Sequence, residues 1–210
     1  MEVTLHSYTQ TNLLSLDNEL SEIIAHTARV SNPTSQAAAF DSDRLIAYLI
    51  EHKHWSPFEM VSVTLDITTT RDIARQLLRH RSFSFQEFSQ RYAVQDTFVM
   101  REPRMQDPKN RQSSLPCTDE SINIKWKLAQ EEVLRVSKKA YNFAIDNGVA
   151  KEVARAVLPE GMTESRLFMH GSIRSLIHYL SIRTGVETQK EHRLIALEIA
   201  KAIDKVFQMP

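Results

Sequence analysis

Residue types that could bind an anionic ligand are concentrated between Arg79 and Tyr92. These fourteen residues include three arginines, one histidine, three serines, one glutamate and three phenylalanines. Arginine offers a planar pair of donors to phosphate or carboxylate, and its flat face stacks on rings. Arginines and aromatic rings beside hydroxyl groups favour a ring-bearing phosphate ligand, such as a nucleotide.

An ordinary structural explanation also fits this stretch, because arginines often cover a solvated helix face and a Phe-x-Phe pair is often core. The preceding residues 71–78 carry apolar side chains at positions 73, 74, 77 and 78, which predicts a helix. One helical turn separates Arg75 from Arg79, and Gln76 from His80. The alternation at residues 82–85 breaks the helical period and predicts an extended segment.

Composition limits the classes of protein to which the chain can belong. Its 210 residues, with 42% hydrophobic and 25% charged content, predict one domain spanning 1–210. The formal net charge is zero, so we expect no nucleic-acid or membrane partner. Four glycines provide no glycine-rich phosphate loop, and a single cysteine excludes an intramolecular disulfide and a multi-cysteine metal site. Without a signal segment or a membrane-length apolar run, we expect a cytoplasmic protein.

Hydrophobic periodicity predicts an α+β fold, in which a small, mainly antiparallel, twisted sheet packs against long helices. Strands are expected at 3–8, 61–68 and 162–169. Helices are expected at 17–31, 42–51, 71–78, 119–147, 151–158, 172–183 and 188–206. Residues 101–117 show no period and predict a long loop, which is often functional or mobile.

The expected helix at 119–147 carries an apolar stripe at alternating spacings of four and three residues. This spacing is typical of helix packing, either in the core or at a subunit contact. The stripe consists of Ile122, Trp126, Ala129, Val133, Val136, Ala140 and Phe143.

The expected helix at 172–183 ends in an arginine that continues its apolar stripe of Ile173, Leu176 and Leu180. Arg183 could reach solvent from the helix end. Alternatively it is buried, and then a planar acceptor must meet it, because an unpaired buried guanidinium is costly. Arg174 and His178 are four residues apart on another face and could hold a second ligand.

The spacing Arg79-His80-Arg81, seven residues, Ser89, then Arg91 resembles the signature of the flavin-dependent thymidylate synthases, and Ser84 and Glu87 also match. The residues of this stretch are most similar to those of a subset of the family that includes viral members. Similar segments run from about Ala28 to about His192. They include Ala-Arg-Val-Ser at 28–31, Ser-Pro-Phe-Glu at 56–59 and Glu-x-Ala-Arg-x-x-Leu-Pro at 152–159.

This resemblance implies reductive methylation of dUMP to dTMP, with methylenetetrahydrofolate as carbon donor and FAD, reduced by NADPH, as hydride source. It also implies the family fold, and a homotetramer in which each active site is shared between subunits. The residues expected to contact dUMP are Gln76, Glu87, Phe88, Ser89, Gln90, Arg91, Arg155 and Arg183. The residues expected to contact FAD are Ser31, His54, Ser56, Arg79, His80, Arg81, Glu87, Ser172, Arg174 and His178. Arg183 is the expected catalytic residue, because stabilising negative charge on the uracil ring lowers the barrier.

Other interpretations have less support. His52, His54 and Glu59 fit no standard zinc spacing, so no metal site is expected. Cys117 has no cationic neighbour in sequence to activate its thiol. A nucleic-acid-binding module is disfavoured by the neutral charge and by the lack of lysine at 71–91. A serine hydrolase using Ser89 is disfavoured because no Gly-x-Ser-x-Gly motif occurs.

Overall fold

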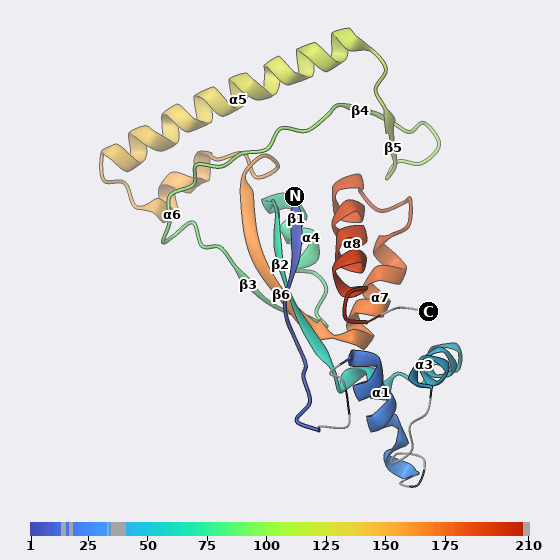
Figure 1. Ribbon diagram of the computed structural model, residues 1–210. Helices are drawn as coiled ribbons and strands as arrows, with labels where there is room; N and C mark the ends of the chain where they lie inside the picture. Colours follow the sequence, from blue (N-terminus) through green and yellow to red (C-terminus); the bar gives the residue numbers. More distant parts are fainter. Residues whose placement is uncertain (14–15, 17–18, 33, 35–40, 208–210) are drawn as a thin grey trace.

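The computed structural model describes residues 1–13, 16, 19–32, 34 and 41–207. A four-stranded sheet of order β1-β2-β6-β3 lies at its centre, and every neighbouring pair is antiparallel (Figure 1). The strands are β1 (Glu2–Tyr8), β2 (Ser62–Thr70), β3 (Ser84–Glu87) and β6 (Glu164–Ser172). The predicted α+β class, with a mainly antiparallel sheet, is therefore confirmed.

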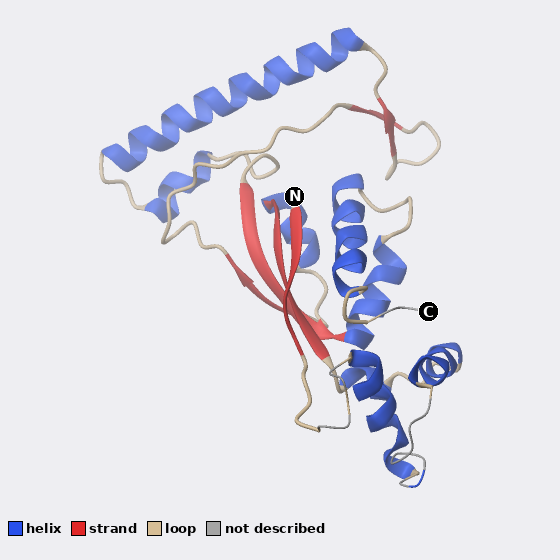
Figure 2. Cartoon of the chain, viewed as in Figure 1, coloured by secondary structure: helices blue, strands red, loops and turns tan. Residues whose placement is uncertain are grey.

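Alternation along the strands gives the sheet one apolar face. Val63, Leu65 and Ile67 of β2 are almost completely buried, whereas the residues between them are only partly covered. Helices α4 (Arg71–Leu77), α7 (Ile173–Arg183) and α8 (Lys190–Ile203) lie to one side of the sheet (Figures 1 and 2). Helix α8 also contacts the edge strand β1. Together these elements form the core that holds the ends of α4 and α7 in place.

A second group of helices packs near the end of the sheet where β2 begins. It comprises α1 (Leu20–Ala28), η1 (Arg29–Ser31), α3 (Ser42–Glu51) and η2 (Ser56–Glu59). Helix α1 begins three residues later than residue 17, where the sequence predicted it. Asp17, the expected cap, and Pro33, the expected stop, lie outside the described residues.

The long helix α5 (Glu120–Asp146) extends across the opposite end of the molecule (Figure 1). Asp119 caps it by accepting hydrogen bonds from the backbone N–H groups of Ser121 and Ile122. Its predicted apolar stripe is not core within this chain. Val136 is 50% exposed and Phe143 is 67% exposed, and only Gln130 and Tyr141 of α5 are buried. Of the two expected uses of the stripe, core packing is therefore wrong.

The prediction of a long loop without secondary structure at 101–117 is also wrong in part. It contains a two-stranded antiparallel hairpin, β4 (Arg104–Gln106) and β5 (Ser114–Pro116). The Asp107 side chain accepts from the backbone N–H groups of Lys109 and Asn110 and so stabilises the turn. Strands of three residues are too short to show an alternating pattern in the sequence.

The remaining elements shift from the predicted bounds by a few residues. The expected helix at 151–158 is a short α6 (Lys151–Ala154) continued by η3 (Arg155–Val157). Strand β6 begins two residues later than expected and runs to Ser172. Among the described residues, no helix is both long enough and apolar enough to cross a membrane.

Candidate active site

The turn after α4 brings His80 against the end of α7. The Arg183 Nε–H donates to His80 Nε2 over 3.0 Å, and Arg183 is partly buried. Burial of the imidazole, together with the nearby Arg183 charge, lowers the pKa of His80. The ring is therefore neutral at pH 7, with Nε2 free to accept. The partly buried Arg183 thus meets a planar acceptor within the chain, the His80 ring.

Gln76 of α4 contacts the buried His192 of α8, which in turn meets Tyr179 of α7. His192 is completely buried, and its Nδ1 lies 3.2 Å from Gln76 Oε1. His192 Nε2 lies 3.1 Å from the Tyr179 hydroxyl, and the His80 and Tyr179 rings meet edge to face at 5.0 Å. Burial, followed by the charge of Arg183, lowers the pKa of His192 to about 4. These contacts place Gln76, His80 and Arg183 in one cluster around the buried Tyr179 and His192 side chains.

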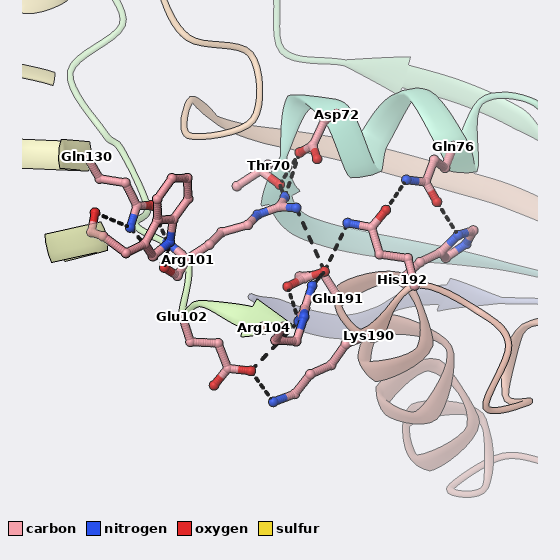
Figure 3. Close-up of polar contacts among 12 residues, drawn as sticks. Thr70, Asp72, Gln76, Arg101, Glu102, Arg104, Gln130, Lys190, Glu191 and His192 are labelled. Carbon is pink, nitrogen blue, oxygen red and sulfur yellow. Dashed lines mark hydrogen bonds and ion pairs between the residues drawn. The ribbon is translucent and has the colours of Figure 1, made fainter. Parts of the chain in front are cut away.

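A carboxylate at the start of α8 joins this cluster to the segment that follows residue 100 (Figure 3). Glu191 receives two hydrogen bonds from Arg104, at 2.7 and 3.0 Å, and one from Gln189 at 3.0 Å. Burial would raise the pKa of Glu191, but hydrogen bonds from Arg104, its own backbone and Gln189 outweigh burial and lower it to about 2. The carboxylate is therefore ionised at any physiological pH.

Arg101 extends the same network to α4 and α5. Its guanidinium donates to Asp72 and to the Thr70 hydroxyl, each over 2.7 Å. Its carbonyl accepts from the Trp126 indole and the Gln130 amide, both over 2.9 Å (Figure 3). The role of residues 101–117, which the sequence left unassigned, is thus partly structural: it connects α5 and the β4–β5 hairpin to the helices of the site.

The expected ligand Glu87 is already engaged within the chain. Its carboxylate lies 3.1 Å from Arg75 and 3.5 Å from Arg71, and it accepts from the Ser165 hydroxyl over 2.9 Å. Arg75 also contacts Glu160 over 3.3 Å. A ligand that uses Glu87 must therefore share it with these arginines.

Two further expected contacts lie where β6 runs into α7. Ser172 caps α7 by accepting from the Ser175 N–H over 3.3 Å. Arg174 donates to Glu59 over 2.8 Å. A hydrogen bond from Ser172 and the contact with Arg174 lower the pKa of Glu59. Glu59 thus holds Arg174 in a defined position on the exposed side of α7.

The segment after β3 carries the expected phosphate ligands toward α6. Arg91 forms an exposed ion pair with Glu152 over 3.1 Å, and the Ser89 hydroxyl accepts from the Arg91 N–H over 3.3 Å. Gln90 is buried and donates to Gln95 over 3.3 Å, so its side chain belongs to local packing in this chain. The other expected members of this group are Phe88, which is exposed, and Arg155, which begins η3.

Arg79 and Arg81 are exposed, and no hydrogen bond or ion pair joins either to another described residue. The serines and histidines expected near the flavin, Ser31, His54, Ser56 and His178, are exposed as well.

Two aromatic residues of the signature, Phe83 and Phe85, belong to the core. Phe83 is only 8% exposed. A Cβ placed on Gly171 would lie 2.3 Å from the Phe83 ring, so only glycine fits at that position of β6. The ordinary explanation of the Phe-x-Phe pair is therefore the right one.

A cavity of about 710 Å³ lies between residues 100–117, α5 and the start of α8, and none of the expected contacts lines it. The part of the chain that the structure describes contains no group of three histidine, cysteine or acidic residues placed to hold a metal ion. Cys117 lines the cavity and its thiol lies 3.7 Å from the Asp119 carbonyl.

The chain is similar to known proteins over nearly its whole length. The model of the family Thy1, thymidylate synthase complementing protein, matches residues 12–208. The flavin-dependent thymidylate synthase of Synechocystis sp. is 47% identical over 209 residues, which cover 99% of this chain and 96% of that protein. The chain belongs to the flavin-dependent thymidylate synthase family. It is accordingly an enzyme of the methyltransferase class.

Two further proteins support the assignment of the chain to this family. A probable flavin-dependent thymidylate synthase of Paramecium bursaria Chlorella virus 1 is 46% identical over 191 residues, covering 90% of this chain and 86% of that protein. The UMP/dUMP methylase PolB from Streptomyces cacaoi, solved with 5-Br dUMP, superposes with a TM-score of 0.81 at 26% identity. That match covers 98% of this chain and 90% of PolB.

Sequence reasoning missed several residues that hold the cluster together, namely Tyr179, Gln189, Glu191 and His192. One signal was available for His192. It lies at helical spacing with Ile195, Ile199 and Ala202 on the buried side of α8, and a histidine there needs polar partners. The contact between Glu191 and Arg104 joins segments 87 residues apart and leaves no local pattern.

Proposed function

We propose that this enzyme converts dUMP to dTMP, taking the carbon from methylenetetrahydrofolate and the hydride from FAD that NADPH has reduced. The observation that carries the proposal is the contact of Arg183 with His80, which joins the end of α7 to the Arg-His-Arg signature. The names of the relatives and the bound dUMP analogue in PolB support the nucleotide and the flavin. We further propose that residues 1–210 act as one domain.

Arg183 is the proposed catalytic residue. For C5 of uracil to attack a carbon electrophile, negative charge must develop on the ring, and a guanidinium at the ring stabilises that charge. His80 accepts from Nε of Arg183, which leaves the two terminal nitrogens of the guanidinium as donors to ring oxygens. The neutral His80 orients the arginine without cancelling its charge.

The proposed dUMP phosphate and sugar site uses Ser89, Arg91 and Arg155, with Gln76 near the cluster. Arg91 is exposed, and its partner Glu152 is exposed too, so a phosphate dianion can replace this weak surface pair. Bidentate binding of phosphate by arginine is stronger than such a pair because the acceptor carries more charge. Further proposed contacts are Glu87, Phe88 and Gln90.

The residues that would hold FAD fit its chemistry. Arg79 and Arg81 are exposed and have no partner among the described residues, so both are available to a diphosphate. Arg174, held by Glu59, supplies a third cation at the start of α7. When bound, the flavin supplies the hydride that reduces the transferred carbon to a methyl group. Further proposed FAD contacts are Ser31, His54, Ser56, His80, Glu87, Ser172 and His178.

A homotetramer with shared sites would bring these separated groups together. The exposed stripe of α5 is the proposed contact with a second copy of the chain, because Val136 and Phe143 would otherwise leave apolar surface in water. The expected contacts at Arg91, Arg174 and His54 come from different elements, and none of them lines the cavity between residues 100–117, α5 and the start of α8. Assembly therefore explains both the exposed stripe and the dispersed site.

The test is anaerobic incubation of the purified protein with dUMP, methylenetetrahydrofolate, FAD and NADPH, with dTMP as the readout. We expect dTMP to form, and we expect the protein to show flavin absorbance and to elute as a tetramer. Formation of dTMP without FAD, or no dTMP from a protein loaded with FAD, would refute the proposal. In a control reaction without methylenetetrahydrofolate, no dTMP should form.

A further inference from the structure

Four hydrogen bonds form a continuous chain from the middle of α7 to the start of α8, and Figure 3 shows its part from His192 to Glu191. The Tyr179 hydroxyl meets His192 Nε2 at 3.1 Å, and His192 Nδ1 meets Gln76 Oε1 at 3.2 Å. Gln76 Nε2 then donates to Gln189 Oε1 over 2.7 Å, and Gln189 Nε2 donates to Glu191 over 3.0 Å. Tyr179 and His192 are completely buried, so neither can exchange its partner for water.

The carboxylate at the end determines the direction of every bond in this chain. An ionised Glu191 can only accept, so Gln189 must turn its NH₂ group toward it and its oxygen toward Gln76. Gln76 then donates through Nε2 and presents Oε1 to His192. Because Oε1 is an acceptor, His192 must carry its proton on Nδ1, which leaves Nε2 to accept from the Tyr179 hydroxyl. Reversing one amide would set two acceptors or two donors against each other.

We propose that His192 is a positioning residue that, together with Gln189, holds the Gln76 amide with its oxygen turned inward, so that Gln76 meets the nucleotide as a hydrogen-bond donor. The Gln76 amide has two N–H groups, and Gln189 uses one of them. The other remains for an oxygen acceptor of the ligand, the class to which phosphate, sugar and uracil carbonyl oxygens belong. His192 acts only through Gln76, since a completely buried ring cannot touch the substrate. This inference rests on the proposed function.

The first experiment compares dUMP affinity among variants of the FAD-loaded protein by titration calorimetry. His192→Leu removes both bonds, leaves the Gln76 oxygen without a donor and holds the amide by Gln189 alone, so we expect dUMP binding to weaken about tenfold, or about 1.4 kcal/mol. His192→Asn keeps an amide donor near the Nδ1 position and should stay within about threefold of wild type. Tyr179→Phe is the matched control: it removes the other bond of His192, and dUMP affinity should be retained.

A double variant separates positioning from a general loss of structure. If His192 acts through Gln76, then adding His192→Leu to Gln76→Ala should weaken dUMP binding no further. Flavin content should be the same in all variants, because no FAD contact is assigned to His192. Wild-type affinity in a folded His192→Leu protein would overturn the inference, and so would full additivity of the two substitutions. If His192→Leu does not fold, the same comparison is made between His192→Asn and Tyr179→Phe, where a larger loss of dUMP affinity in Tyr179→Phe overturns the inference.

A second experiment needs no nucleotide. In protein labelled with ¹⁵N-histidine, the His192 signals are assigned by their loss in His192→Asn, and the ring nitrogen that carries the proton is read from the ¹⁵N shifts. We expect the Nδ1–H form, and finding the Nε2–H form would overturn the inference. A wild-type protein that binds FAD but no dUMP would refute the proposed function and this inference together. If wild-type protein binds dUMP normally and substitution of His192 does not change the dUMP affinity, this inference is refuted but the proposed function is not.

Discussion

Replacing Glu191 by glutamine tests the network that joins α8 to the β4–β5 hairpin. The Glu191 side chain is 14% exposed and Arg104 is 16% exposed, so their two hydrogen bonds are poorly screened by water. In the folded chain the hydrogen bonds from Arg104 and Gln189 lower the pKa of Glu191 from its ordinary value of 4.5 to about 2. At 1.36 kcal/mol per unit, the ionised carboxylate contributes on the order of 3 kcal/mol to the free energy of unfolding at pH 7. Glu191→Gln should lose about that amount, because Arg104 then keeps a buried charge with a weaker partner.

The dependence on pH follows from the sign of this shift. A carboxyl group with a lowered folded pKa stabilises the protein fully above its unfolded value of 4.5, and this contribution is lost as the pH falls toward 2. Glutamine does not titrate. The difference in stability between wild type and Glu191→Gln should therefore be constant from pH 7 to about pH 5 and then shrink below pH 4.5.

The assay is chemical denaturation, or thermal unfolding where it is reversible, at several pH values. For a chain of this length, about 3 kcal/mol corresponds to a fall in melting temperature of about 6–12 °C at pH 7. Glu198→Gln is the control on the same helix, since its ion pair with Lys201 is exposed and should contribute little. A loss below about 1 kcal/mol for Glu191→Gln at pH 7, or a difference unchanged at pH 3.5, would refute the reasoning.

Arg183→Ala should cut turnover about a hundredfold even at saturating dUMP, and lysine should rescue poorly because it lacks the planar fork; steady-state kinetics on flavin-loaded protein decide this. Arg91→Ala should mainly raise the KM for dUMP, since phosphate binding is shared by ground and transition states, and a large fall in turnover alone would contradict that role. Cys117→Ser should retain most of the dTMP-forming activity, and complete loss of activity in a folded variant would indicate that the Cys117 thiol acts as a nucleophile. Val136→Glu on the exposed face of α5 should shift the protein to smaller species in sedimentation. An unchanged oligomer size would show that α5 does not form the subunit contact.

Sequence periodicity predicted most of the fold because most elements bury one regular face. The buried set Ile73, Ala74 and Leu77 of α4 matches the predicted stripe. Prediction was wrong where the deciding contacts are not local. The stripe of α5 reads like core in the sequence, yet within one chain it faces outward, since periodicity indicates a packing face but not which molecule covers it.

The site could be predicted only in part, for a related reason. The sequence named Gln76, His80 and Arg183 as separate candidate contacts, and the structure shows that Arg183 meets His80 and that Gln76 meets His192. The groups that orient them could not be found this way, because Gln76 meets its partner His192 across 116 positions of sequence. Whether the remaining expected contacts meet dUMP and FAD stays a prediction.

The contact of α8 with the edge strand β1 has a consequence for how the chain folds during synthesis. Strand β1 leaves the ribosome first among the described elements, but the helix that covers it follows more than 180 residues later. Until then, the apolar face of the growing sheet lacks part of its cover and is open to wrong pairing with other chains. Such long-range closure slows folding, because the entropy of a long loop must be lost before the contact forms. Chaperone dependence should therefore concentrate in the interval before α8 emerges, and truncations that remove α8 should aggregate rather than fold as smaller units.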